Sequence, residues 1–146
     1  IGVRLVGSEM CIRDSTLRFA YDFSKDIKGG TVICLDGEIG AGKTVFAKGF
    51  ALGLGIDDDI VSPTFTIMQV YDGGRLPLYH FDAYRISDSD EMYEIGFEDY
   101  LFGSGVCIIE WSELIEDIIP GSAIKIRIDR DVQKGLDYRR ITVEGL

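Results

Sequence analysis

One eight-residue segment constrains this chain more than any other feature: residues 37–44 read GEIGAGKT. The segment matches the pattern G-x-x-x-x-G-K-[ST]. Residues 31–36 before it are a short apolar run typical of a buried strand, and residues 45–54 after it carry apolar side chains at four-residue spacing, typical of a helix. A strand, a glycine-rich turn and a helix in this order predict a P-loop, which binds nucleotide phosphates. The alternative is a glycine-rich turn that matches the pattern by chance.

Each residue type in this segment suits phosphate binding. Glycines permit positive φ and let the backbone approach a phosphate closely. Successive backbone N–H groups and the helix N-terminus then present partial positive charge to an anion. Lys43 would bring a full charge to the β- and γ-phosphates, and the Thr44 hydroxyl is a candidate Mg²⁺ ligand.

Length and composition indicate a single globular domain. The chain has 146 residues, of which 46% are hydrophobic. We find no apolar run near the roughly 18 residues that a transmembrane helix needs, and no signal peptide. Cys34 and Cys107 lie inside apolar runs and match no metal-ligand pattern, which predicts buried free thiols in a reducing cytoplasm.

The charge distribution is uneven. The formal net charge is −10, and residues 86–124 contain no Lys or Arg. Such a surface repels a phosphate backbone, so we do not expect direct, tight nucleic-acid binding. The acidic stretch is either a solvated face or a docking face for a basic protein.

Apolar periodicity and turn signals divide the rest of the chain into helices and strands. We expect helices at 15–27, with Ser15 as the N-cap, at 45–54, at 87–94, with a capping box at Ser87, and a short helix or turn at 112–118. We expect strands at 3–6, 31–36, 65–71, 76–82, 106–110, 123–128 and 139–143. Alternating elements around a P-loop predict an α/β, P-loop NTPase-like three-layer domain with a mixed, mainly parallel central sheet.

Two carboxylates end apolar strands and are candidates for the metal side of the site. Asp82 ends residues 78–82 and Glu110 ends residues 106–110. A P-loop site needs a carboxylate that contacts the metal or holds its water. The sequence leaves their roles open; we favour Glu110 for the metal because its strand is the more uniformly apolar and therefore the more central.

Three further features each have more than one interpretation. The segment at 62–66, SPTFT, would either sense the γ-phosphate or Mg²⁺ or form a turn that enters a strand. Arg85 would either neutralise transition-state charge or pair with the acidic face. Trp111 would belong to the core, cover the site as an amphipathic lid, or act as a contact aromatic.

Four segments, in this order, resemble the TsaE (YjeE) family, the P-loop ATPase of bacterial tRNA threonylcarbamoyladenosine biosynthesis. They are GEIGAGKT at 37–44, SPTFT at 62–66, YHFDAYR at 79–85 and IEWSE at 109–113. The third and fourth are far more specific than the P-loop. Ala83 stands where the family usually has leucine. The resemblance covers residues 15–146 as one P-loop ATPase domain, and we place residues 1–14 outside the family.

The resemblance implies a protein that binds ATP and Mg²⁺ and hydrolyses ATP weakly when alone. It implies action with the TsaB–TsaD protein complex, which modifies tRNA, so that tRNA is contacted only through that complex. ATP hydrolysis would reset the complex between turnovers and would not perform the transfer. No membrane association is expected.

The resemblance also implies roles for individual residues. Thr44 and Glu110 match the family's Mg²⁺ ligands, and Asp82 matches an aspartate needed for activity, so Lys43, Asp82 and Glu110 are the catalytic candidates. Arg139 is the best match to an arginine of the C-terminal hairpin that touches the nucleotide. The candidates for nucleotide binding are Glu38, Ile39, Gly40, Ala41, Gly42, Lys43, Thr44, Thr64 and Arg139.

Two other functions compete with this one. A small-molecule P-loop kinase usually closes an arginine-bearing lid over its acceptor, and residues 86–124 supply no basic residue for such a lid. A nucleotide-sensing binding module without useful turnover would carry the same P-loop. The guanine-reading motif Asn-Lys-x-Asp is absent, which favours ATP.

Overall fold

The computed structural model describes residues 3–8, 12–130, 133–135 and 138–145, and within these ranges the strands form one sheet. The strands are β1 (Val3–Ser8), β2 (Val32–Gly37), β3 (Met68–Tyr71), β4 (Leu78–Asp82), β5 (Val106–Glu110), β6 (Ile124–Arg130) and β7 (Arg139–Glu144). Their order is β1-β7-β6-β2-β5-β4-β3. The four central strands, β6, β2, β5 and β4, run parallel to one another. The outer pairs, β1–β7, β7–β6 and β4–β3, are antiparallel. The prediction of a mixed sheet with a parallel centre is confirmed.

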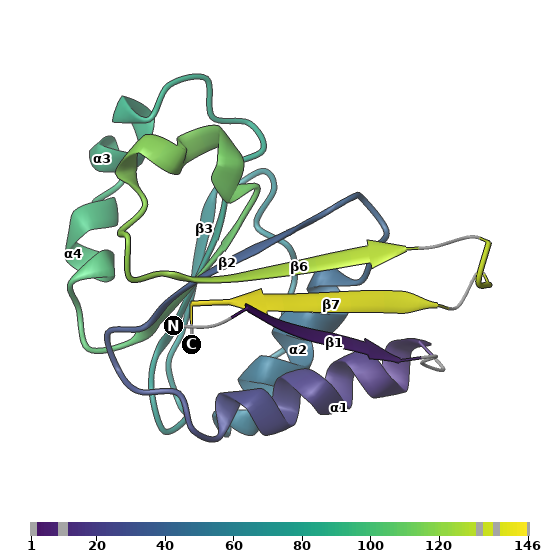
Figure 1. Ribbon diagram of the computed structural model, residues 1–146. Coiled ribbons are helices and arrows are strands. Elements are labelled where there is room, and N and C mark those ends of the chain that lie inside the picture. Colours follow the sequence, from purple (N-terminus) through teal and green to yellow (C-terminus); the bar gives the residue numbers. More distant parts are fainter. Residues whose placement is uncertain (1–2, 9–11, 131–132, 136–137, 146) are drawn as a thin grey trace.

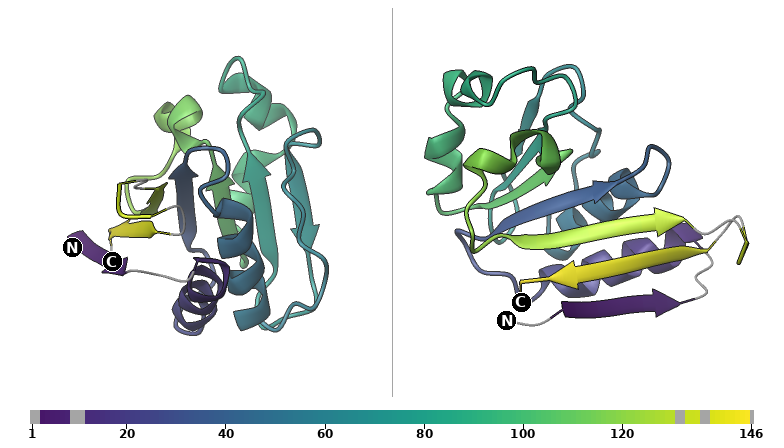
Figure 2. Two further views of the ribbon diagram at one scale, coloured as in Figure 1. Left: turned by 90° about the vertical axis from the view of Figure 1, so that its right-hand side faces the viewer. Right: turned by 45° about the horizontal axis from the view of Figure 1, so that its top comes forward.

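Helices cover both faces of this sheet, as Figures 1 and 2 show. One face carries α1 (Ile12–Ser24) and α2 (Lys43–Gly53), which pack side by side. The other face carries α3 (Asp90–Glu94), α4 (Phe97–Leu101) and the 3₁₀ helix η1 (Ser112–Ile118). The three-layer architecture follows, because each face of the sheet is apolar and needs a cover.

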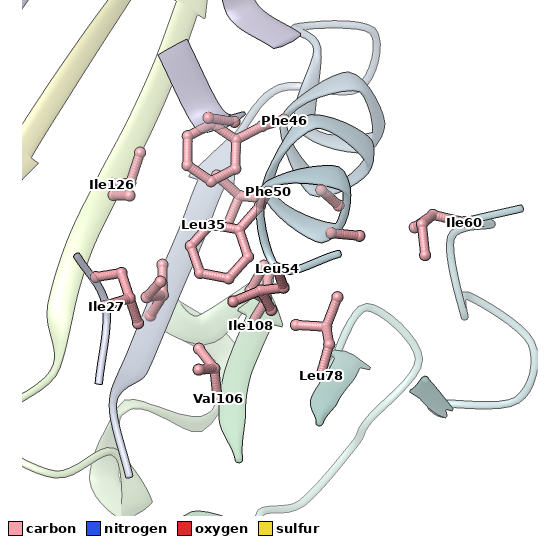
Figure 3. Packing of buried hydrophobic residues seen from close by; sticks show 14 of the residues in the cluster. Ile27, Leu35, Phe46, Phe50, Leu54, Ile60, Leu78, Val106, Ile108 and Ile126 are labelled. Atoms are coloured by element: carbon pink, nitrogen blue, oxygen red, sulfur yellow. The ribbon is translucent and has the colours of Figure 1, made fainter. Parts of the chain in front are cut away.

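One hydrophobic cluster lies on each side of the sheet. Successive strand residues point to opposite faces, so Leu35 and Ile108 belong to the cluster under α2, while Cys34 and Ile109 belong to the other cluster. Figure 3 shows the first cluster, with the phenyl rings of α2 between the helix and the strands. All five residues of β5 are buried, as its uniformly apolar sequence predicts for a central parallel strand.

Helix α1 is shifted towards the N-terminus relative to our prediction. It begins at Ile12, so Ser15 lies inside the helix and is not its N-cap. It ends at Ser24, and Arg75 from a distant loop bonds carbonyls at and beyond this end: its Nη2 donates to the Ser24 carbonyl at 2.8 Å and its Nη1 to the Ile27 carbonyl at 3.0 Å. A local pattern contains no information about such a partner.

Two other predictions about local structure were wrong. The capping box at Ser87 is absent; Ser89 is the N-cap of α3, and its Oγ donates to Asp117 Oδ1 at 2.6 Å instead of capping the helix. Strand β3 starts three residues later than predicted, because Ile67 adopts a positive φ of 68° and its N–H bonds the Pro63 carbonyl. The helix α4, which follows Gly96 directly, was not predicted.

The N-terminal segment also differs from the short strand predicted at 3–6. Strand β1 extends to Ser8 and pairs antiparallel with β7 along the sheet edge. Residues 1–2 and 9–11 of the segment that we placed outside the family lie outside the described residues. The boundary at residue 14 stays a prediction.

Both described cysteines are buried free thiols, as predicted. Burial raises the pKa of Cys107 to about 12 and also raises the pKa of Cys34. No helix in the described ranges has the length and apolar character needed to cross a bilayer.

Candidate active site at the carboxyl edge of the sheet

The predicted P-loop connects β2 to α2, at the edge where the parallel strands end. Gly40 and Gly42 have φ of 81° and 113°, the left-handed region that glycine adopts without strain. Gly42 is the N-cap of α2 and provides no side-chain cap, and the first turn of the helix contains no acidic residue. A Cβ at Gly42 would meet nothing within 4 Å, so open space lies in front of the helix N-terminus. These features fit an anion.

Lys43 lies folded over this loop. Its side chain is 7% exposed, and its Nζ donates to the Gly37 carbonyl at 2.5 Å. The same ammonium group lies 4.4 Å from the centroid of the Trp111 ring, a cation–π contact. The two contacts keep the only full positive charge of the loop within the pocket.

Asp82 and Glu110 are paired across β4 and β5 in the parallel register, and both are 2% exposed. They end neighbouring strands, and by strand alternation they lie on the same face as α2. The structure therefore brings together the two carboxylates that the sequence placed at strand ends. It does not divide the metal and water roles between them.

Asp82 anchors the loop that contains Ser62 and Thr64. Its Oδ2 accepts hydrogen bonds from Ser62 Oγ at 3.2 Å and Thr64 Oγ1 at 3.0 Å. Its Oδ1 accepts the backbone N–H of Tyr84 at 2.9 Å. A ligand that binds beside Asp82 would therefore also affect the loop that carries Ser62 and Thr64.

Glu110 contacts a residue, His80, that the sequence analysis did not predict as part of the site. Glu110 Oε2 lies 2.6 Å from Nε2 of His80, and both side chains are buried. The backbone carbonyl of Glu110 accepts the N–H of Ala83 at 3.0 Å. The signal for His80 was a polar residue at a core position of an otherwise apolar strand, two residues before Asp82.

These groups line one pocket of about 550 Å³. Its walls are Thr16, Ile39, Gly40, Ala41, Gly42, Lys43, Thr44, Val45, Ser62, Thr64, Asp82, Tyr84, Glu110, Trp111 and Arg139. The structure thus brings together every predicted site residue except Glu38, which is 72% exposed and lies 3.8 Å from Arg130 Nη2. Thr16 and Tyr84 line the pocket without having been predicted.

Two arginines differ in their position relative to the pocket. Arg139 is 9% exposed, and its Nε donates to the Ala41 carbonyl at 2.9 Å, so it supports the loop backbone from β7. Arg85 lies outside the pocket, over the exposed ring of Phe65 at 4.3 Å. Within the described ranges Arg85 forms no ion pair with the acidic face.

The donor set fits a magnesium ion that is shared with a phosphate. No group of three or more His, Cys, Asp or Glu side chains among the described residues could form a protein-only metal site. Mg²⁺ typically takes one or two protein oxygens and completes its shell with phosphate oxygens and water. Thr44 and Glu110, which both line this pocket, supply that number.

Two comparisons with known protein sequences point to one family. The family model described as "Threonylcarbamoyl adenosine biosynthesis protein TsaE" matches residues 12–141. The chain is 50% identical over 115 residues to the "tRNA threonylcarbamoyladenosine biosynthesis protein TsaE" of Bacillus subtilis, covering 79% of this chain and 70% of that protein. It is 42% identical over 113 residues to the protein of the same name from Treponema pallidum, covering 77% and 83% of the two chains.

A solved structure shares the fold. The crystal structure of Bacillus subtilis YdiB superposes with a TM-score of 0.80 at 40% sequence identity, over 98% of this chain and 86% of that one. The family resemblance of the four segments is confirmed: the chain belongs to the TsaE family of tRNA threonylcarbamoyladenosine biosynthesis proteins.

Proposed function

We propose that this TsaE-family chain is the ATP-binding and ATP-hydrolysing subunit of tRNA threonylcarbamoyladenosine biosynthesis. The observation that carries the proposal is one pocket lined both by Lys43 and Thr44 of the P-loop and by Asp82 and Glu110. A lysine and an uncapped helix N-terminus favour a polyphosphate, and two buried carboxylates beside them favour a metal and a water.

Lys43 and the backbone amides of residues 39–44 bind the phosphates. In binding, the Lys43 ammonium exchanges the Gly37 carbonyl for phosphate oxygens, which are stronger partners because both groups are charged. Arg139 keeps the loop in place through the Ala41 carbonyl. Thr16 and Ile39, which also line the pocket, are available to the rest of the nucleotide.

Thr44 and Glu110 hold Mg²⁺, and Asp82 orients the attacking water. The ion, when bound, neutralises the charge that develops on the transferred phosphoryl group. Asp82 is suited to the water because its carboxylate is already fixed by Ser62, Thr64 and Tyr84. The family resemblance implies weak hydrolysis by the isolated chain, and Arg85, which lies over the Phe65 ring outside the pocket, adds no charge to the site.

The proposed partner is the TsaB–TsaD complex, with tRNA contacted only through it. The net charge of −10 disfavours direct binding to tRNA. ATP hydrolysis resets the complex between rounds of modification, and the transfer itself takes place on the partner.

The test is reconstitution with TsaB–TsaD and substrate tRNA, following multiple-turnover modification and ADP release. Wild-type protein should support many turnovers, whereas Thr44→Ala and Glu110→Ala should limit the reaction to about one. If the Glu110→Ala protein supports full turnover without ATP consumption, the chain is a sensing module. If a metabolite acceptor stimulates ADP release more than TsaB–TsaD does, the chain is a kinase.

A further inference from the structure

His80 is the only histidine of the chain, and it is fully buried in the sheet. It lies in the middle of β4, 0% exposed, on the face covered by α2. Its neighbour on the same face is Leu78, and its register partner on β5 is Ile108. A polar ring at this place needs a reason other than burial of apolar surface.

The two nitrogens of the His80 ring are in different situations. Nε2 lies 2.6 Å from Glu110 Oε2, while Nδ1 is buried and has no hydrogen-bond partner among the described residues. A buried polar atom without a partner costs folding free energy. Because Nδ1 has no partner among the described residues, the hydrogen bond at Nε2 is the polar interaction that His80 contributes.

The contact restricts the carboxylate of Glu110. A carboxylate only accepts hydrogen bonds, so the His80 Nε2–H donates to Oε2. The described residues offer Oε1 no hydrogen bond, and Glu110 lines the nucleotide pocket. Oε2 therefore bonds His80, and Oε1 is available to a ligand in the pocket. Asp82, two residues along β4, has other partners, so His80 acts on Glu110 alone.

We infer that His80 is a positioning residue that holds the Glu110 carboxylate in the orientation required to ligate Mg²⁺ beside a bound nucleotide. The inference rests on the proposed function, because it requires Glu110 to be the metal-side carboxylate. A residue behind a metal ligand typically changes metal affinity about 10- to 100-fold when it is removed. His80 should therefore affect the magnesium-dependent part of nucleotide binding and leave the rest unchanged.

A pair of substitutions separates this role from packing. A glutamine amide nitrogen reaches about as far from the backbone as Nε2 does, whereas an asparagine amide reaches only as far as Nδ1. His80→Gln thus retains a donor for Glu110, and His80→Asn retains the polarity without the donor. Ile108→Val is the matched control, because it removes one methylene from the adjacent core position and weakens packing by a small amount.

The first measurement is ADP affinity by calorimetry, with Mg²⁺ and with a chelator, on proteins whose fold is verified by circular dichroism. In wild-type protein, Mg²⁺ should tighten ADP binding. His80→Asn should lose about tenfold or more of the affinity in Mg²⁺ and stay within about twofold of wild type in the chelator. His80→Gln should recover most of the loss, and Ile108→Val should match wild type in both conditions.

The second measurement uses the single imidazole directly. Protein labelled with ¹⁵N-histidine gives one pair of ring-nitrogen signals, which should shift when Mg²⁺ is added to the ADP-saturated protein and should not shift when ADP is added alone. Glu110→Gln should abolish the magnesium-induced shift.

The outcomes distinguish this inference from the proposed function. A wild-type protein that binds no nucleotide refutes the proposed function and the inference together. Magnesium-dependent binding that is the same in His80→Asn as in wild type refutes the inference alone. Equal losses in Mg²⁺ and in chelator for His80→Asn and His80→Gln assign His80 to packing and also overturn it.

Discussion

The side chain of Asp36 forms hydrogen bonds with the turn that follows Glu110, and we expect its removal to lower the free energy of unfolding. Asp36 stands near the end of β2, where its Oδ1 accepts the Ser112 N–H at 2.9 Å and its Oδ2 accepts the Ser112 hydroxyl at 2.6 Å. Between Glu110 and Ser112 lies Trp111, whose φ of 55° is unusual for a residue other than glycine. The two bonds help to hold that backbone conformation against its strain.

The magnitude follows from the two bonds that Asp36→Ala deletes. A hydrogen bond to a charged group contributes about 1.5–3 kcal/mol when buried, and Asp36 is half-buried, so the lower value applies to each. We expect a loss of about 3 kcal/mol in the free energy of unfolding. For a chain of this size that loss lowers Tm by about 6–12 °C. Asp36→Asn retains an acceptor and should lose only about 1 kcal/mol.

The assay is urea unfolding followed by fluorescence and by far-UV circular dichroism. Trp111 is the only tryptophan, so its fluorescence reports on the turn itself. Asp22→Ala is the control, because Asp22 forms an exposed helical ion pair with Arg18 at 3.4 Å whose removal should change stability by less than about 0.5 kcal/mol. If Asp36→Ala and Asp22→Ala unfold with the same free energy as wild type, the proposed role of the Asp36–Ser112 contact is wrong.

Three further predictions concern the P-loop, the helix packing and a buried thiol. Lys43→Ala should weaken ATP binding about 10- to 100-fold in calorimetry, because it removes the charge that contacts the phosphates. Gly49→Ala should destabilise the chain by about 1–3 kcal/mol despite the higher helix propensity of alanine, because the added Cβ would lie 2.2 Å from the Leu17 carbonyl oxygen; Gly121→Ala, with nothing within 4 Å, should be neutral in the same thermal scan. Cys107 should react with a thiol reagent only after unfolding. Because its pKa is about 12 in the folded chain against 9.0 as the ordinary value, stability should be independent of this thiol below pH 9 and fall between pH 9 and 12, and a fall that begins near neutral pH would contradict the assigned burial.

Local patterns were sufficient wherever a residue's role depends on its immediate neighbours. The P-loop was predicted because its glycines, lysine and hydroxyl stand in one continuous stretch between a strand and a helix. Strand β5 was predicted because all of its positions are buried on both faces, which leaves an uninterrupted apolar run before Glu110. The strand ends then placed Asp82 and Glu110 at one edge of the sheet, since parallel neighbours end together.

Element boundaries that depend on contacts between distant segments were predicted wrongly from local patterns. Carbonyls at and beyond the end of α1 are bonded by Arg75, which lies about fifty residues further along, and the start of β3 depends on the unusual backbone of Ile67. The capping box failed because α3 begins after Ser89, whose hydroxyl donates to Asp117 of another element and does not cap the helix. None of these partners has a fixed spacing along the chain.

By itself, the sequence determined the family, the P-loop segment between a strand and a helix, the α/β class and the two carboxylates at strand ends. Each of these depends on continuous segments with a recognisable periodicity or spacing. Only the tertiary structure decided how the carboxylates are held: Asp82 by Ser62 and Thr64, and Glu110 by His80. Those contacts join residues that are 18 to 30 positions apart. They require the fold, because the pleat of β4 and β5 turns His80, Asp82 and Glu110 to the same face and the loop with Ser62 and Thr64 lies beside Asp82.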